Sequence, residues 1–158
     1  MQTITPFLWF DNKAEQAAKF YVGIFNNSKI LGVSRNADAG PGRKGSVMVV
    51  DFQIAGQRFQ ALNGGPIYKI SPAISFVVDC ADQVEVDHFW NKLSAGGKKV
   101  QCGWLQDKFG VSWQIVPRAF VKMMNDKNPE KAGRVFAAMM KMKKLDIKAL
   151  QKAHDGKK

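Results

Sequence analysis

Hydrophobic and polar residues alternate along residues 1–66 in a pattern that predicts one helix among four strands. Over residues 13–25, apolar side chains recur three and four positions apart, as on one face of a helix. They are Ala14, Ala17, Ala18, Tyr21 and Phe25. Short apolar runs bounded by turn residues predict strands over residues 3–10, 29–35, 46–54 and 57–62. The glycines and prolines of residues 37–45 predict a flexible loop.

The same order of elements recurs in the second half of the chain. The pattern predicts a strand over residues 73–78, a helix over 83–94 and strands over 99–102, 105–108 and 111–116. ITPFLWFD, residues 4–11, aligns with PAISFVVD, residues 72–79, at a shift of 68. GQRFQ, residues 56–60, aligns with GVSWQ, residues 110–114, at a shift of 54. We therefore predict a duplicated βαβββ module and an α+β fold.

The two-residue period of a strand assigns each side chain to one face of its sheet. One set is wholly apolar and suits the faces packed under the two helices. It comprises Leu8, Phe10, Phe59, Ala61, Ile74, Phe76, Val78, Trp113 and Ile115. The opposite faces mix apolar walls with a few hydrogen-bonding groups, which is the usual composition of a ligand pocket. The two glutamines of the repeat, Gln60 and Gln114, fall on these opposite faces.

The positive charge of the chain is concentrated in its C-terminal segment. The chain of 158 residues has a net charge of +11, of which residues 118–158 contribute +8. This segment predicts helices over residues 119–125, from Pro129 onward, and over 146–153. The middle helix carries an apolar stripe at Ala132, Val135, Phe136, Met139 and Met140. The segment is either a basic arm for nucleic acid or an acidic partner, or a set of helices packed on the domain or a dimer partner. The stripe and the lack of interleaved aromatic residues favour packing.

Few residues suggest catalysis. The chain has two histidines, His88 on a predicted helix surface and His154 in the basic segment, and two cysteines, Cys80 and Cys102, which we expect to be reduced. Asp51, the acid within an apolar strand, either is a base on the face opposite the helix or sits at an exposed strand edge. No Ser-His-Asp or Cys-His set stands at a readable spacing.

The sequence lacks three features that bear on the location of the protein and on its cofactor: a long apolar run, a signal peptide and a glycine-rich turn after the first strand. No run of eighteen apolar residues exists, and the first residues carry no signal-peptide pattern, so we expect a cytoplasmic protein without a membrane segment. The first predicted strand is followed by WFDNKAEQ, which contains no glycine. A nucleoside cofactor usually requires a glycine-rich turn at that point. We therefore expect no such cofactor.

Six segments carry a resemblance to a known family. ITPFLWFDNKAEQAAKFYVGIF, GQRFQALNGGP, ISFVVDCADQ, FWNKLSAGGK, QCGWLQDKFGVSWQIVP and NPEKAGRVFAAMMKMKKLDIKALQKA are similar to PhnB-like proteins of the vicinal oxygen chelate superfamily, a branch often labelled 3-demethylubiquinone-9 3-methyltransferase. The resemblance implies two βαβββ modules, roughly residues 1–66 and 71–117, whose sheets form a cup around a small-molecule site, with a basic helical extension over 118–158. It also implies a homodimer.

The resemblance places the metal ligands of the superfamily near Thr5, Ala73 and Gln114. None is the imidazole, thiolate or carboxylate that transition metals prefer, so we expect no metal. We predict instead a metal-independent protein that binds an unknown small molecule in the cup. The expected ligand-binding residues are Thr5, Phe7, Trp9, Gln60, Ser75, Trp104 and Gln114. Two alternatives remain, an enzyme of unknown reaction and a basic nucleic-acid-associated protein.

Overall fold

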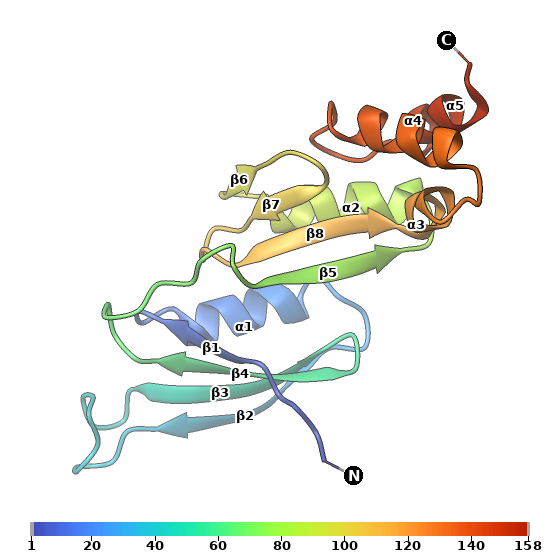
Figure 1. Cartoon of the computed structure of the whole chain (residues 1–158). Helices are drawn as coiled ribbons and strands as arrows, with labels where there is room; N and C mark the ends of the chain where they lie inside the picture. Colours follow the sequence, from blue (N-terminus) through green and yellow to red (C-terminus); the bar gives the residue numbers. More distant parts are fainter. Residues whose placement is uncertain (1, 158) are drawn as a thin grey trace. The chain divides into compact units, whose positions relative to one another are not determined.

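The chain forms two units that divide between Ile70 and Ser71, and each contains a four-stranded sheet with a helix on one face (Figure 1). The structure is a computed structural model and describes residues 2–157. Each unit repeats the predicted order of strand, helix and three strands, and helices follow in the second unit. The predicted α+β fold of two βαβββ modules with C-terminal helices is therefore confirmed.

The first unit pairs its strands in the order β1-β4-β3-β2. Its elements are β1 (Phe7–Phe10), α1 (Ala14–Val22), β2 (Lys29–Arg35), β3 (Val47–Ile54) and β4 (Gln57–Asn63). The strands β1 and β4 run parallel, and the other two pairs are antiparallel. The predicted strand over residues 3–10 is longer than β1, because only residues from Phe7 onward pair with β4.

Helix α1 covers one face of the first sheet with the predicted side chains. Ala14, Ala17, Ala18 and Tyr21 are buried on this helix, and Phe25, which follows its end, is buried as well. The ring of Tyr21 stacks on that of Phe52, which stacks in turn on Phe59. This aromatic row is the core of the first unit. Burial of each such ring stabilises the fold by roughly 1.5–3 kcal/mol.

The second unit repeats this strand order as β5-β8-β7-β6. Its elements are β5 (Ser75–Cys80), α2 (Gln83–Leu93), β6 (Lys98–Lys99), β7 (Trp104–Gln106) and β8 (Ser112–Pro117). Asp82 caps α2, because its side chain accepts a hydrogen bond from the N–H of Glu85 at 2.9 Å. Ile74 was expected on the helix face but is 71% exposed, because β5 begins only at Ser75.

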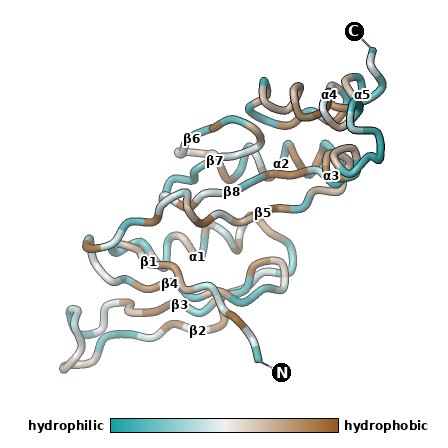
Figure 2. The backbone as a smooth tube through the Cα atoms, in the orientation of Figure 1, coloured by the Kyte–Doolittle hydropathy of each residue, from teal (hydrophilic) through white to brown (hydrophobic). Residues whose placement is uncertain are grey.

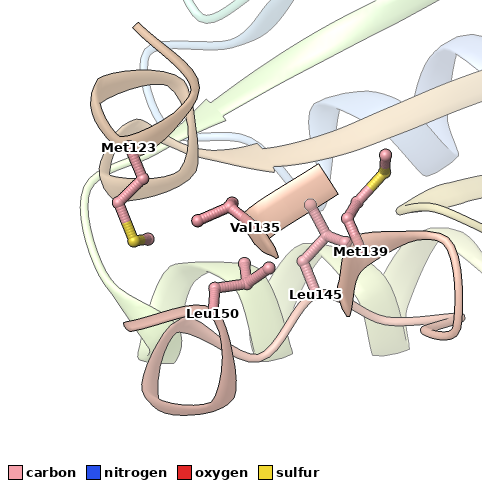
Figure 3. Packing of buried hydrophobic residues seen from close by; sticks show 5 residues of the cluster. All are labelled: Met123, Val135, Met139, Leu145 and Leu150. Carbon is pink, nitrogen blue, oxygen red and sulfur yellow. The ribbon is translucent and has the colours of Figure 1, made fainter. Parts of the chain in front are cut away.

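Three further helices complete the second unit: α3 (Arg118–Met124), α4 (Pro129–Met139) and α5 (Ile147–Asp155). Figure 2 shows hydrophobic and hydrophilic positions alternating along α4 and α5. The hydrophobic positions meet in one cluster, seen in Figure 3. Its buried members are Met123, Val135, Met139, Leu145 and Leu150. The expected packing of the apolar stripe is confirmed for Val135 and Met139, whereas Phe136 and Met140 remain about half exposed.

Residues 142–147 fasten these helices to the rest of the second unit. The carbonyls of Met142 and Lys143 accept hydrogen bonds from the N–H groups of Cys102 and Gly103, at 2.8 and 2.7 Å. The side chain of Gln83 on α2 donates to the carbonyl of Leu145 and accepts from the N–H of Ile147. The basic segment is therefore part of the folded unit.

The pairing of the strands shows how the two halves correspond. Gln60 pairs with Phe7 across β4 and β1, and Gln114 pairs with Val77 across β8 and β5. If the glutamines are equivalent, Phe7 corresponds to Val77, a shift of 70 rather than the 68 of the sequence alignment. Because the difference is even, the assignment of side chains to faces does not change.

Candidate functional site

The face of the first sheet opposite α1, called here its open face, carries three of the predicted ligand-binding residues. Phe7 and Gln60 are paired neighbours on β1 and β4, and Trp9 lies two residues after Phe7. The ring of Phe7 is 52% exposed, whereas Gln60 and Trp9 are half-buried. Thr5 is also half-buried but precedes β1, so no strand fixes it on this face.

Trp9 is held in place by the segment that follows β4. Its indole Nε1 donates a hydrogen bond to the carbonyl of Gly65 at 2.9 Å. The ring packs so closely on Gly64 that a Cβ atom there would overlap it. Tyr68 contacts the same ring edge-on, with centroids 5.0 Å apart. The ALNGGP segment therefore fixes an aromatic wall beside Phe7.

Asp51 and Arg58 form an ion pair on the same open face. Asp51 pairs with Gln60 in the ladder between β3 and β4, in the interior of the sheet, so its expected placement at an exposed strand edge is wrong. Its two carboxylate oxygens accept hydrogen bonds from Nε and Nη2 of Arg58. These bonds, with one from Gln60, hold the pKa of Asp51 below its usual value. A carboxylate that stays ionised is a weak general base at neutral pH.

The second sheet presents a neutral polar pair on the face opposite α2, its open face. The amide Nε2 of Gln114 donates to the hydroxyl of Ser75 at 2.9 Å. Trp104 pairs with Gln114 across β7 and β8, and Val77 pairs with it on the other side. Val77 is 60% exposed, and the other three residues are half-buried. Three predicted residues, Ser75, Trp104 and Gln114, therefore lie together.

A buried aspartate that sequence reasoning missed organises the turn before β8. Asp107 is 3% exposed, and its carboxylate accepts hydrogen bonds from the N–H groups of Phe109 and Val111 and from Trp113 Nε1, at 2.8 to 3.1 Å. The DKFGVSW segment thus has a structural role. The sequence feature that could have indicated this role is an acidic residue followed within a few positions by glycine and tryptophan.

The side chains at the expected metal positions do not suit a transition metal. Ala73 has no donor atom and is exposed, Thr5 offers a neutral hydroxyl, and the Gln114 amide is bonded to Ser75. Within residues 2–157, no three His, Cys, Asp or Glu side chains are grouped so as to hold a metal ion. His88 is exposed on α2, as expected. His154 lies between two carboxylates, with its Nε2 2.8 Å from Asp126 and its Nδ1 3.5 Å from Asp155.

The two cysteines occupy different surroundings. Cys80 is fully buried under α2, and this burial raises the pKa of its thiol to about 12. Cys102 is half-buried, and its sulfur lies 3.7 Å from that of Met140. Both are free thiols. Among the helices that the structure describes, none is long and apolar enough to cross a bilayer.

Two units of mixed four-stranded sheet, each with one helix on a face, define a protein of the glyoxalase/bleomycin-resistance fold. A family model described as 3-demethylubiquinone-9 3-methyltransferase matches residues 2–116. The chain therefore belongs to this family and is PhnB-like. No curated protein matches the chain.

Solved structures support the same conclusion. A PhnB protein from Bacillus cereus is 36% identical, with a TM-score of 0.67 over 73% of this chain and 99% of that one. A protein from Pseudomonas aeruginosa is 20% identical, with a TM-score of 0.62 over 74% and 98%. A fosfomycin resistance protein from Listeria monocytogenes is 14% identical, with a TM-score of 0.58 over 79% and 98%. The last two similarities concern the fold alone.

Proposed function

We propose that this protein binds a small organic molecule on the open faces of its sheets and does so without a metal ion. The observation that carries the proposal is the composition of these faces. Each presents a glutamine amide beside a large, exposed apolar side chain, Phe7 in the first sheet and Val77 in the second. An apolar wall with a few fixed polar groups is typical of ligand-binding sites.

The polar groups are already oriented by neighbours within the protein. Gln114 donates to Ser75, which leaves its carbonyl oxygen as an acceptor and the serine hydroxyl as a donor. In the first sheet, Asp51 fixes Arg58 and bonds Gln60. A ligand that meets such groups loses less free energy to ordering side chains. The proposed ligand-binding residues are therefore Phe7, Trp9, Gln60, Ser75, Trp104 and Gln114, with Thr5 at their margin.

The residues of the site favour binding over the reaction in the family description. Methyl transfer from a nucleoside cofactor usually relies on a glycine-rich turn between a strand and a helix. The turn between β1 and α1 is Asp11-Asn12-Lys13, and the turn between β5 and α2 is Ala81-Asp82. Neither contains a glycine. We also propose that the chain acts as a homodimer, since Ile67 and Tyr68 are large side chains that lie mostly exposed.

The test combines a metabolite screen with two substitutions. Thermal-shift screening identifies a ligand, and calorimetry then measures its affinity for Gln60→Leu and Gln114→Leu. We expect each substitution to weaken binding by about 1–3 kcal/mol, which is roughly fivefold to more than a hundredfold. The melting temperature should change little, because both side chains are only half-buried. Chelation with EDTA should change neither the melting temperature nor the affinity.

Gln57→Leu is the matched control, because Gln57 lies on the same strand as Gln60 but three residues away and exposed. It should leave the affinity unchanged. The proposal fails if ligands found in the screen bind the Gln60 and Gln114 variants as tightly as the unaltered protein. One tightly held metal ion per chain, measured by mass spectrometry, would contradict the metal-independent part.

A further inference from the structure

An apolar groove with basic ends lies between α4 and α5. It encloses about 550 Å³ and is lined by Arg134, Ala137, Ala138, Lys141, Met142, Ala149, Ala153, Gly156 and Lys157. Arg134 and Ala137 lie on a side of α4 different from the one that bears Val135 and Met139, whereas Ala138 and Met142 also pack against the buried cluster. The groove is therefore an additional surface, and none of the predicted ligand-binding residues contributes to it.

Positive charge stands at both ends of the groove. Arg134 lies on α4, whereas Lys141 lies in the turn that follows the last residue of α4, Met139. Arg134 is fixed by hydrogen bonds from its Nε and Nη2 to the carbonyls of Ala153 and His154, at 2.8 and 2.7 Å. Lys157 follows Gly156, which packs against the Arg134 guanidinium. Lys141 forms no ion pair within residues 2–157.

The floor between these charges consists mainly of methyl groups. Ala137 and Ala138 contribute from α4, and Ala149 and Ala153 contribute from α5. The last two are four residues apart and so share a face of α5. Small side chains allow the backbone of another helix to approach closely. Bulkier apolar residues on that helix could then contact Met142 and the alanine methyls.

We propose that this groove binds an acidic amphipathic helix of a partner protein, which would lie as a third helix beside α4 and α5. Carboxylates on either side of an apolar stretch of such a helix match the basic groups at both ends, and the apolar residues between them cover the alanine floor. The +8 charge of residues 118–158 attracts acidic partners and accelerates their encounter.

Other occupants match the groove less well. A simple fatty acid has one anionic end and would leave the basic group at the other end unmatched. Nucleic acid would match the charges, but the floor between them offers methyl groups where stacking aromatic rings would be needed. The charge pattern and the shape of the floor together therefore favour the helix.

The experiment selects peptides from a randomised library of helical peptides displayed on phage, with the full-length protein as bait. The selected peptides should carry acidic residues on both sides of a stretch of apolar residues. Fluorescence anisotropy then measures the best peptide against groove variants. Ala137→Phe should fill the groove, and Lys141→Glu should reverse the charge at one end. Each should weaken binding roughly tenfold or more, corresponding to at least about 1.4 kcal/mol.

Two control variants separate the groove from general electrostatic attraction. Val84→Phe introduces the same ring on the exposed side of α2, and Lys148→Glu makes the same charge change on an exposed part of α5 outside the groove. Neither should weaken binding more than about twofold, apart from the small effect of net charge. Ala137 is exposed, so its replacement should leave the fold intact, which circular dichroism checks.

Several results would overturn the proposal. One is a failure to enrich any acidic peptide. Another is peptide binding that is unchanged by Ala137→Phe but equally weakened by Lys141→Glu and Lys148→Glu. That result would indicate that the peptide is attracted by net charge only. A single-stranded oligonucleotide that binds more weakly to Ala137→Phe would assign the groove to nucleic acid. Self-association lost in that variant would assign it to a second copy of the chain.

Discussion

The two sheets share one strand order but differ in how their outer strands are stabilised. In the first unit, β2 and β3 are seven and eight residues long and pair along most of their length. In the second unit, the corresponding strands β6 and β7 have only two and three residues. Fewer ladder hydrogen bonds leave more backbone groups that require other partners.

The second unit supplies these partners from elsewhere in the chain. Residues 142–143 accept the backbone hydrogen bonds of Cys102 and Gly103. The carboxylate of Asp107 accepts two more from backbone N–H groups in the turn before β8, and one from the Trp113 indole. In the first unit the corresponding turn has only two residues, Ala55 and Gly56, and their N–H groups donate to Ser28 and Asn27. The comparison shows that one topology can be maintained by strand length in one copy and by side chains and added helices in the other.

The largest effect is expected from Leu145→Ala. This side chain is 1% exposed, belongs to the buried cluster and packs against Gly103. Its loss should lower the free energy of unfolding by about 2–5 kcal/mol through the cavity it leaves. Hydrogen exchange should accelerate in β7 and α4 more than in β2 and β3. Leu31→Ala, on the exposed edge strand of the first sheet, should cost well under 1 kcal/mol. Equal destabilisation of both sheets would contradict the comparison.

A smaller loss is expected from Asp107→Ala. The substitution leaves the N–H groups of Phe109 and Val111 and the indole of Trp113 without their acceptor in a buried turn. The free energy of unfolding should fall by about 2–3 kcal/mol, measured by urea denaturation. Asp107→Asn retains one acceptor oxygen and should lose less. If the alanine variant is as stable as the unaltered protein, Asp107 does not hold the turn.

The smallest effect is expected from Asp51→Asn, which compares the charged open face of the first sheet with the neutral open face of the second. The pKa of Asp51 is lowered in the folded state, chiefly by its hydrogen bonds with Arg58, so the pair stabilises the fold above the unfolded pKa of about 4. This contribution is lost as the pH falls through the lowered pKa. Asp51→Asn should cost less than about 1 kcal/mol near pH 7, since Arg58 is largely exposed. The difference in melting temperature should disappear as the pH falls below the lowered pKa of Asp51. For Gln114→Leu, the difference in melting temperature from the unaltered protein should be independent of pH.

Much of the fold could be predicted because periodicity records which side chains are buried. The helix faces at Ala14–Phe25 and Val86–Leu93, and the inward positions Phe59, Ala61, Trp113 and Ile115, are apolar for that reason. Strand ends were less predictable, since residues 3–6 and 73–74 have strand-like composition but lie outside the paired registers of β1 and β5. Pairing depends on residues distant in sequence, which local pattern does not contain.

The open faces could be assigned in part from sequence. Alternation placed Gln60 and Gln114 opposite the helices, but it could not indicate that Asp51 engages Arg58 or that Gln114 engages Ser75. Such bonds depend on the register between neighbouring strands. The same limit applies to Asp107, whose partners depend on the shape of a turn, and to the groove, which requires the relative placement of α4 and α5.

The hydrogen bonds of Cys102 and Gly103 with residues 142–143 also set an order of events during synthesis. The first unit contains all its strands by Asn63, so it can fold while later residues are still being translated. The second unit cannot complete its loop until Lys143 has emerged. At about 5–20 residues per second, the ribosome needs roughly 1–5 s to proceed from Pro117 to Lys143. During that interval the newly made β7 and β8 lack the contacts that residues 142–145 later supply.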